Sequence, residues 1–322
     1  MNKTSKIVLA TITVLVVVVG IIVSCFNIEL SKVNKVKIEK NNSELNISNN
    51  AAKKDDEITN IAFFGIDRRY KGEASRSDAL MILTIDKKHK KIKISSVMRD
   101  AYVNIDGYGM TKINHAYAYG GPMMSIKTLN KNFDLNIKDY VTVDFLGFEK
   151  IIDSVGGVEV NITPAELKYV NSNTDENSEN GDAAASIVTN SGLQKVNGRQ
   201  ALKYTRIREN DGGDFERTER ERTVLIHVLN KIKKVPPTDM IGLVSELLPY
   251  TETNMSNTNI LKMLTSIYTL GIKDIGEQRF PLDGYCDGKM IDNVWYLMFD
   301  LNATKNQMHK YIFEDIKPNS IK

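Results

Sequence analysis

An uncharged run of twenty residues near the N terminus constrains this chain more than any other feature of the sequence. Residues 7–26 contain no Asp, Glu, Lys or Arg. An apolar helix of about 20 residues spans a bilayer whose hydrocarbon core is roughly 30 Å thick. Lys3 and Lys6 precede the run and no acidic residue does. We therefore expect a cytoplasmic tail at 1–6, a transmembrane anchor at 7–26 and the rest of the chain outside the cytoplasm.

Two alternatives to an uncleaved anchor over this run remain open. A cleaved signal peptide requires a shorter apolar stretch and a small-residue cleavage site, which the sequence lacks. Residues 22–25 loosely resemble a lipidation signal that ends at Cys25. We favour the anchor because the run is long enough to span the membrane.

The charge and cysteine content argue against a protein that binds nucleic acid through a general basic surface and against a disulfide-rich scaffold. Of the 43 basic residues, two lie in the first 28 positions, and none of the 40 acidic residues does, so the remainder carries a net charge of +1. No general basic field is available to attract nucleic acid, and any anion site must be a local cluster. Only Cys25 and Cys286 are present, so a disulfide framework is not expected.

The region after the anchor divides into a polar linker and one folded domain. Residues 27–57 are rich in Asn, Lys and Ser, and we expect an extracytoplasmic linker there. The catalytic domain is predicted at 58–322. Apolar periodicity predicts strands at 59–65, 80–85, 91–97 and 158–162, with a hairpin turn at 86–90. Helices are predicted at 122–133, 145–155, 197–205, 214–234, 256–270 and 301–313, and an exposed loop at 171–185.

This order of elements predicts an α/β fold. Strands and helices interleave, but at least one strand pair is a hairpin. We therefore expect a mixed central β-sheet flanked by helices on both faces. Asn197 and Gln200, three residues apart, predict a capping box at the start of one of the helices.

Common signatures of phosphate and hydrolytic chemistry are missing. The sequence has no G-x-x-x-x-G-K-[ST] loop, no G-x-G-x-x-G and no G-x-S-x-G elbow. The four histidines are scattered through the chain, which does not favour a zinc site.

Arginines cluster instead, at the ends of the predicted elements. They are Arg68, Arg69, Arg76, Arg99, Arg206, Arg208, Arg217, Arg220 and Arg222. A guanidinium group donates paired hydrogen bonds to phosphate oxygens and stays charged, so several arginines together suit a diphosphate. Taken singly, each arginine also fits a solvated face or a structural ion pair.

Two aspartates lie among these arginines, where they would repel a phosphate group. Asp67 follows the first strand and Asp78 opens the second. A hard divalent cation between them removes the conflict, because Mg²⁺ binds one or two carboxylates together with phosphate oxygens. Arg217 and Glu221 share one helix face that continues into Val224 and Val228, so polar groups are expected to face the core at the start of that helix.

The ordered set of motifs resembles the LytR-CpsA-Psr family over roughly residues 58–235. These motifs lie at 65–69 (G-x-D-x-R), 76–78 (R-x-D), 99–100 (R-D), 112–117 (K-I-N-x-A-Y), 143–148 (V-D-F-x-G-F), 156–160 (G-G-V-x-V), 198–208 (G-x-x-A-L-x-Y-x-R-x-R) and 214–220 (D-x-x-R-x-x-R). No single motif is specific, but their order behind one N-terminal apolar helix is.

The resemblance implies a membrane-bound phosphotransferase. It would transfer a glycan-1-phosphate from a polyprenyl diphosphate carrier to peptidoglycan, with Mg²⁺, or Mn²⁺ in its place. The implied metal ligands are Asp67 and Asp78. The implied catalytic residues are Arg99, Asp100, Arg206 and Arg208, with Asp100 the candidate general base. The implied substrate-binding residues are Arg69, Arg76, Lys112, Arg217, Arg220 and Glu221.

Two positions depart from the family pattern. Met98 stands where the family usually has Pro, and Glu221 stands where it usually has Gln. A carboxylate at position 221 would face the phosphates and add negative charge. We interpret it as a tolerated substitution, because a carboxyl and an amide are nearly isosteric.

Two rival functions use the same features. A membrane-tethered, non-catalytic sensor of lipid-linked wall precursors would need the same arginine cluster. A transcription regulator fits poorly, since the domain has a net charge of +1, no recognisable helix-turn-helix and an outward-facing anchor.

Overall fold

The computed structural model describes residues 34–36, 40–54, 56–68, 75–171, 187–208, 213–272 and 274–320. The predicted anchor at 7–26, Arg69, and the predicted exposed loop from residue 172 onward lie outside these ranges. None of the helices within the described ranges is long and apolar enough to cross a membrane.

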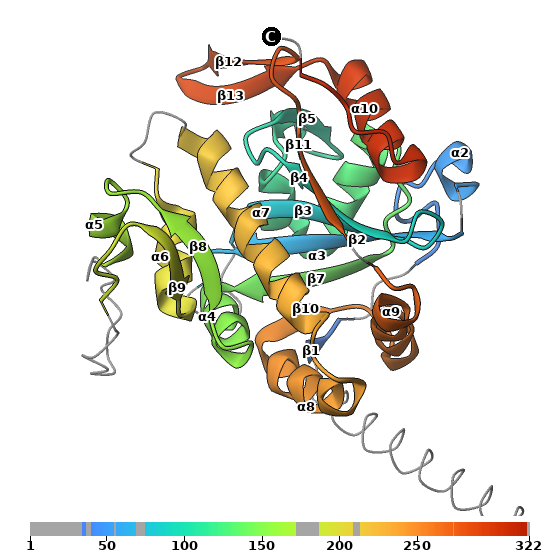
Figure 1. The fold of residues 1–322 in the computed structure, drawn as a ribbon. Helices are drawn as coiled ribbons and strands as arrows, with labels where there is room; N and C mark the ends of the chain where they lie inside the picture. The colour runs from blue at the N-terminus through green and yellow to red at the C-terminus, as the bar shows by residue number, and fades with distance from the viewer. Residues whose placement is uncertain are drawn as a thin grey trace, which may run out of the picture.

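A seven-stranded mixed sheet forms the centre of the molecule (Figure 1). Its order is β1-β10-β7-β2-β3-β4-β11. The strands are β1 Asn34–Lys35, β2 Ile58–Ile66, β3 Ser77–Asp86, β4 Lys91–Val97, β7 Asp139–Asp144, β10 Thr251–Thr253 and β11 Ile275–Phe280. Strands β2, β3 and β4 pair antiparallel, whereas β7 joins β2 and β11 joins β4 in parallel. The predicted mixed sheet is confirmed.

Helices cover both faces of this sheet. On one face, Phe64 and Ile82 pack with side chains of α3 His115–Phe133 and α10 Leu301–Glu314. On the other, Ile61 and Ile85 pack against α8 Pro237–Leu247 and α9 Asn257–Thr269. Successive side chains of a strand point to opposite faces, so each of the two strands feeds both cores.

The folded part begins before the predicted boundary at Ile58. Residues 40–54 carry the short helix α2 Asn49–Ala52. Leu45, Ile47 and Ala51 are buried in the core that α3 and α10 share. Three apolar side chains of this Asn-rich stretch are therefore packed, and Asn34–Lys35 before it form β1 of the central sheet. Part of the predicted linker thus belongs to the folded domain.

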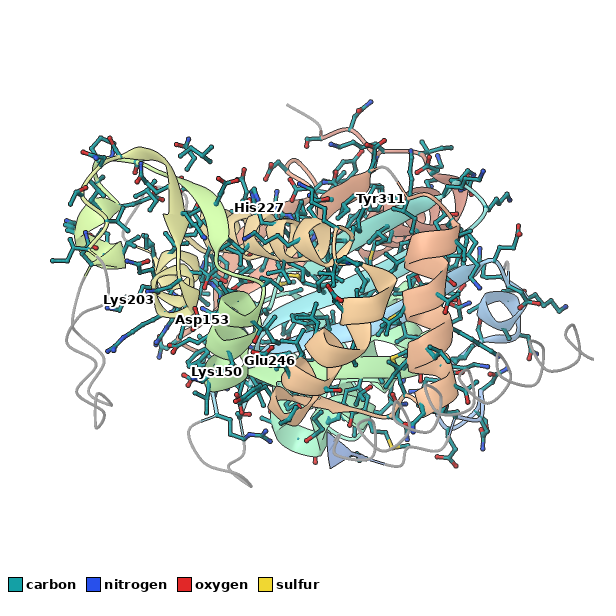
Figure 2. The ribbon with its side chains drawn as sticks, turned by 60° about the horizontal axis from the view of Figure 1, so that its bottom comes forward. Lys150, Asp153, Lys203, His227, Glu246 and Tyr311 are labelled. Carbon is teal, nitrogen blue, oxygen red and sulfur yellow. The ribbon has the colours of Figure 1, made fainter. Side chains whose placement is uncertain are left out.

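A smaller layer flanks the sheet at the ends of β2 and β7. It contains α4 Phe145–Ser154, β8 Val158–Ile162, α5 Leu167–Val170, β9 Gly192–Val196, α6 Gly198–Arg206 and α7 Gly213–Ile232. Helices α4 and α6 approach closely, since a Cβ atom on Gly198 would lie 2.1 Å from the Glu149 carbonyl oxygen. The Asp153 carboxylate on α4 accepts a hydrogen bond of 2.7 Å from the Gly198 amide (Figure 2). The predicted capping box of Asn197 and Gln200 is also present.

Two further hairpins lie at the end of the sheet opposite α8 (Figure 1). They are β5 Tyr102–Ile105 with β6 Gly109–Lys112, and β12 Cys286–Ile291 with β13 Val294–Phe299. Helix η1 Leu248–Tyr250 completes the elements. The amide of Leu297 donates a 3.0 Å hydrogen bond to the Asp100 carbonyl oxygen, which ties the second hairpin to the turn after β4.

Candidate functional site

A cavity of about 440 Å³ lies between the central sheet and helices α4, α6 and α7. Most of its walls are apolar. The lining side chains come from β2 and β3 (Phe63, Ile66, Ala79, Met81), from β7 and α4 (Val143, Phe145, Phe148, Ile151, Ile152) and from α6 and α7 (Leu202, Val224, Leu225, Val228). Apolar side chains on three helices and three strands therefore enclose a space suited to a hydrocarbon chain.

Charged side chains line the same cavity. They are Asp67, Asp78, Asp144, Arg206, Arg208, Arg217 and Glu221. The β2–β3 pairing explains why two of them meet: Gly65 pairs with Ala79, so the end of β2 and the start of β3 lie side by side. Asp67 and Asp78 therefore reach one cavity from two strands. The cavity is apolar in most of its lining and strongly charged in one part.

The first turns of α7 carry an ion-pair network. Arg217 Nε lies 3.0 Å from Asp214 Oδ1, and Arg217 Nη1 lies 2.8 Å from Glu221 Oε1. Arg99, in the turn after β4, contacts Asp214 at 3.0 Å through Nε and Asp78 at 2.7 Å through Nη1. Two guanidinium groups thus hold three carboxylates at one side of the cavity.

Burial and the charges of this network shift the pKa values of Glu221, Asp214 and Arg217. Burial raises the pKa of Glu221 to about 7, and Arg217 only partly offsets that shift. Burial also acts to raise the pKa of Asp214, but Arg217 and Arg99 hold it below its ordinary value. The Arg217 pKa is raised, because Glu221 and Asp214 outweigh the opposing effect of burial. Glu221 is therefore a weaker acid than Asp214 in this network.

Arg206 and Arg208 follow one another at the C-terminal end of α6. The Arg206 guanidinium lies 4.8 Å from the centre of the Phe145 ring. Burial, together with Arg99 and Arg217, lowers the pKa of Arg208. No hydrogen bond or ion pair joins Arg208 to another residue in the described part of the chain. Arg208 therefore presents its positive charge to the cavity close to two other arginines. An anion bound there would stabilise the charged form of Arg208.

Asp100 and Lys112 lie next to this network but do not line the cavity. Lys112 Nζ is 2.6 Å from Asp100 Oδ1, and Arg99 Nε is 3.5 Å from Asp100 Oδ2. Both oxygens of Asp100 therefore face cations. Arg76 is exposed before β3, where its charge contributes to lowering the pKa of His115, after the larger effect of burial.

Arg220 lies away from the cavity, although we predicted it as a substrate ligand. Its Nε is 2.9 Å from Glu166 Oε1, its Nη1 donates a hydrogen bond of 3.1 Å to the Ile207 carbonyl oxygen, and its Nη2 is 2.8 Å from Glu216. The side chain is 7% exposed. The structure thus gives Arg220 a structural position that fastens α7 to α5 and to the end of α6.

One charged residue of the cavity was absent from the predicted site. Asp144 begins α4 and caps it, since its Oδ1 accepts a 2.9 Å hydrogen bond from the Gly147 amide. Its other oxygen lies 3.6 Å from Arg68. The signal was available, because Asp144 belongs to the V-D-F motif, but that motif was used only for the resemblance.

A divalent cation would find two suitable ligands in this cavity. No group of three or more His, Cys, Asp or Glu side chains that could hold a metal occurs within the described ranges. Asp67 and Asp78 nevertheless line the same cavity. Mg²⁺ is commonly bound by one or two carboxylates with phosphate oxygens and water completing the shell. The donor set therefore fits Mg²⁺ in the presence of a phosphate ligand.

The fold and the site define an α/β protein with a largely apolar cavity whose charged part carries three arginines. Residues 21–312 match the model of the LytR_cpsA_psr family. The chain belongs to this family.

Relatives with curated names carry two different descriptions. The chain is 32% identical over 270 residues to "Regulatory protein MsrR" of Staphylococcus aureus, covering 83% of this chain and 78% of the relative. It is 34% identical over 243 residues to the "polyisoprenyl-teichoic acid--peptidoglycan teichoic acid transferase TagU" of Bacillus mycoides, covering 74% of this chain and 73% of the relative.

Solved structures share the fold. "TagT bound to LI-WTA" superposes with a TM-score of 0.66 at 25% identity, covering 86% of this chain and 99% of that structure. The B. subtilis TagV crystal structure superposes with a TM-score of 0.62 at 25% identity, covering 82% of this chain and 100% of that structure.

Proposed function

We propose that this protein transfers a glycan-1-phosphate from a polyprenyl diphosphate carrier to peptidoglycan. One observation carries the proposal: a single cavity combines apolar walls with Arg206, Arg208 and Arg217. A lipid diphosphate has the matching two parts, a hydrocarbon chain and a compact anionic head. The name of the TagU relative and the ligand of the TagT structure support the same substrate class.

The arginines bind the diphosphate in this proposal. A charge-assisted hydrogen bond contributes roughly 1.5–3 kcal/mol, and guanidinium groups bind phosphate in pairs of bonds. Arg206 and Arg208 approach from α6 while Arg217 approaches from α7. The polyprenyl chain lies between α4, α6 and α7 against Phe148, Leu225 and other apolar walls. Arg99 positions Asp78 and Asp214 rather than lining the cavity itself.

Mg²⁺ is part of the proposal, with Mn²⁺ as a substitute. Asp67 and Asp78 would hold it, because both carboxylates reach the cavity. When bound, the cation neutralises phosphate charge that the two aspartates would otherwise repel.

The transfer forms one bond and breaks another at a single phosphorus atom. The oxygen of an acceptor hydroxyl attacks the phosphorus that carries the glycan. The bond from that phosphorus to the bridging oxygen breaks, and polyprenyl phosphate leaves with the bridging oxygen. The hydroxyl proton passes to a base or to water. The arginines stabilise the charge that spreads over the phosphoryl oxygens, which is the main requirement of phosphoryl transfer.

The proposed topology places this reaction at the outer face of the membrane. Residues 7–26 would anchor the chain beside the donor lipid, with residues 27–322 outside the cytoplasm. An alkaline phosphatase fusion after Lys40 should be active. A well-expressed but inactive fusion would contradict this orientation.

Transfer by the full-length chain tests the function directly. The chain in detergent micelles would be incubated with radiolabelled lipid-linked glycopolymer, Mg²⁺ and peptidoglycan. We expect label to become insoluble with the peptidoglycan. Tight donor binding with no transfer under any condition would instead favour the non-catalytic sensor.

A further inference from the structure

Exposed aromatic and apolar side chains gather on the two hairpins beside the cavity. Trp295 and Met290 face each other across β12 and β13 and are 38% and 59% exposed, and Met110 on β6 is 49% exposed. Tyr296 and Tyr102 are half-buried next to them and pack edge-on at 4.8 Å between ring centres. Large side chains in adjoining exposed positions of a monomer usually mark a binding surface. We call these five residues the hairpin platform.

A chain of contacts connects the hairpin platform to the cavity. Asp78 lines the cavity and lies 2.7 Å from Arg99. Arg99 contacts Asp100, and Asp100 contacts Lys112 at 2.6 Å. The Lys112 ammonium lies 6.0 Å from the Trp295 ring centre and 5.9 Å from that of Tyr296. Three charged side chains, Arg99, Asp100 and Lys112, therefore connect the polar end of the cavity to the platform.

The backbone holds the Trp295 ring in place. Gly288 of β12 lies beneath the ring, and a Cβ atom there would come within 2.7 Å of Trp295 Nε1. The hairpin itself is fixed to the Asp100 turn through the backbone bond from Leu297 and through a bridge between Ala101 and Leu297. Trp295 is thus a pre-positioned aromatic surface, which costs little conformational entropy on binding.

We infer that the hairpin platform binds the carbohydrate chain of the acceptor. The inference rests on the proposed function, because an acceptor hydroxyl must reach a phosphate held at the arginines, and a polymer does not fit a cavity of about 440 Å³. The acceptor must therefore lie on the adjoining surface. Arg99 and Asp100 lead from the charged end of the cavity to this platform.

The chemistry of the platform favours a glycan. A pyranose ring presents an apolar face of C–H groups that stacks on Trp and Tyr, while its hydroxyl groups need polar partners. The exposed side chain of Asn104 and the ammonium of Lys112 stand among the aromatic rings on the outer face of β5–β6. A folded protein partner would instead bury roughly 800 Å² on this side around a continuous apolar centre. Polar groups between the rings suit a glycan better than such a partner.

The fluorescence of the chain provides a direct test, because Trp295 is its only tryptophan. The full-length protein in detergent micelles would be titrated with soluble peptidoglycan glycan strands stripped of their stem peptides. We expect a saturable change in Trp295 emission. Gly288→Ala should displace the ring and raise the half-saturating concentration roughly tenfold, the size of effect expected for an anchoring aromatic.

Transfer kinetics form the second arm. Trp295→Ala should raise the acceptor KM roughly tenfold and leave donor binding unchanged, and Trp295→Phe should restore most of the loss. Leu193→Ala is the matched control, since Leu193 is also an exposed apolar residue (67%), on the β8–β9 hairpin. That variant should keep the wild-type acceptor KM.

The outcomes separate this inference from the proposed function. A saturable Trp295 response without any transfer would support glycan binding by the platform and would contradict the proposed transferase activity. Normal transfer with no Trp295 response, or with an unchanged acceptor KM in Trp295→Ala, would overturn the platform. A response to the stem peptides but not to the glycan would also overturn it.

Discussion

Arg217 donates a hydrogen bond of 2.8 Å to Glu221 one turn further along α7, with only 4% and 12% of the two side chains exposed. A pair of this spacing on an exposed helix contributes only about 0.3–0.5 kcal/mol. Here Arg217 is buried and Glu221 is largely shielded beside Asp214 and Asp78, so desolvation is the largest effect on the Glu221 carboxyl. Glu in place of the usual Gln at position 221 therefore affects the stability of the site more than the similar shapes of the two side chains suggest.

Glu221→Gln should change how stability depends on pH. The Glu221 pKa rises from an ordinary 4.5 to about 7, so the folded state holds this proton more tightly than the unfolded state does. The contribution of Glu221 to stability therefore falls as pH rises through that window, by on the order of 3 kcal/mol. Relative to wild type, the Gln variant should gain stability between pH 4.5 and pH 8.

Urea unfolding at several pH values measures this difference. Glu219→Gln, at an exposed position of the same helix, is the control and should follow wild type. Parallel stability curves for wild type and Glu221→Gln would show that the carboxyl titrates as it does in the unfolded chain.

Arg206→Ala and Arg208→Ala should each slow transfer roughly 10²–10³-fold, the cost of losing one well-placed donor to a developing anion. Lys at either position should rescue only part of the rate, because an ammonium lacks the planar fork. Arg199→Ala, on α6 but not lining the cavity, is the control. Near-normal transfer by either cavity variant would assign that arginine a structural role.

Arg220→Ala should destabilise the fold rather than remove a substrate contact. The change leaves the buried Glu166 without its partner and removes a donor from the Ile207 carbonyl. Breaking a buried pair in this way costs roughly 3–5 kcal/mol. Denaturant unfolding should show the loss. A variant of normal stability that no longer binds donor would instead support a direct role for Arg220.

Removal of metal should stop transfer. With Asp67 and Asp78 as ligands, EDTA should abolish activity and excess Mg²⁺ or Mn²⁺ should restore it. Asp78→Asn should lower the affinity for Mn²⁺ measured by electron paramagnetic resonance in the presence of donor. Asp283→Asn, far along the chain at an exposed site, should not. Full activity in EDTA would refute the metal site.

A larger side chain in the apolar wall should discriminate between lipid lengths. Leu225→Trp fills part of the cavity, so a long-chain polyprenyl donor should bind more weakly while a short-chain analogue is affected less. Leu229→Trp, one turn further along α7 and outside the cavity lining, is the control. Equal weakening of both donors would place the lipid elsewhere.

Local patterns in the sequence determined much of the fold. The strands at 91–97 and 158–162 match the predicted bounds, and the capping box at Asn197 marks the start of α6. These signals work because alternation, helical spacing and caps involve residues only a few positions apart. Strand β10 has three residues and carries no such pattern, and its place in the sheet depends on pairing with β1 and β7, which are distant in the sequence.

The arginine set was visible in the sequence because its members follow one another closely near the predicted ends of elements, although Arg222 lies in the middle of α7. Asp67 and Asp78 line one cavity, because adjacent antiparallel strands place the end of one beside the start of the next. Their role as metal ligands stays a prediction. The family followed from the order of the motifs, and the family match extends over residues 21–312.

Only the tertiary structure decided which charged groups face the cavity. Arg217 and Arg220 are three residues apart on α7, so their side chains diverge around the helix by roughly 60°. Glu166, which precedes α5, pairs with Arg220. Arg217, by contrast, lines the cavity. The burial of Leu45, Ile47 and Ala51 and the low exposure of Glu221 arise in the same way. Burial depends on which distant segment packs against a residue, and that contact is absent from the local spacing of the sequence.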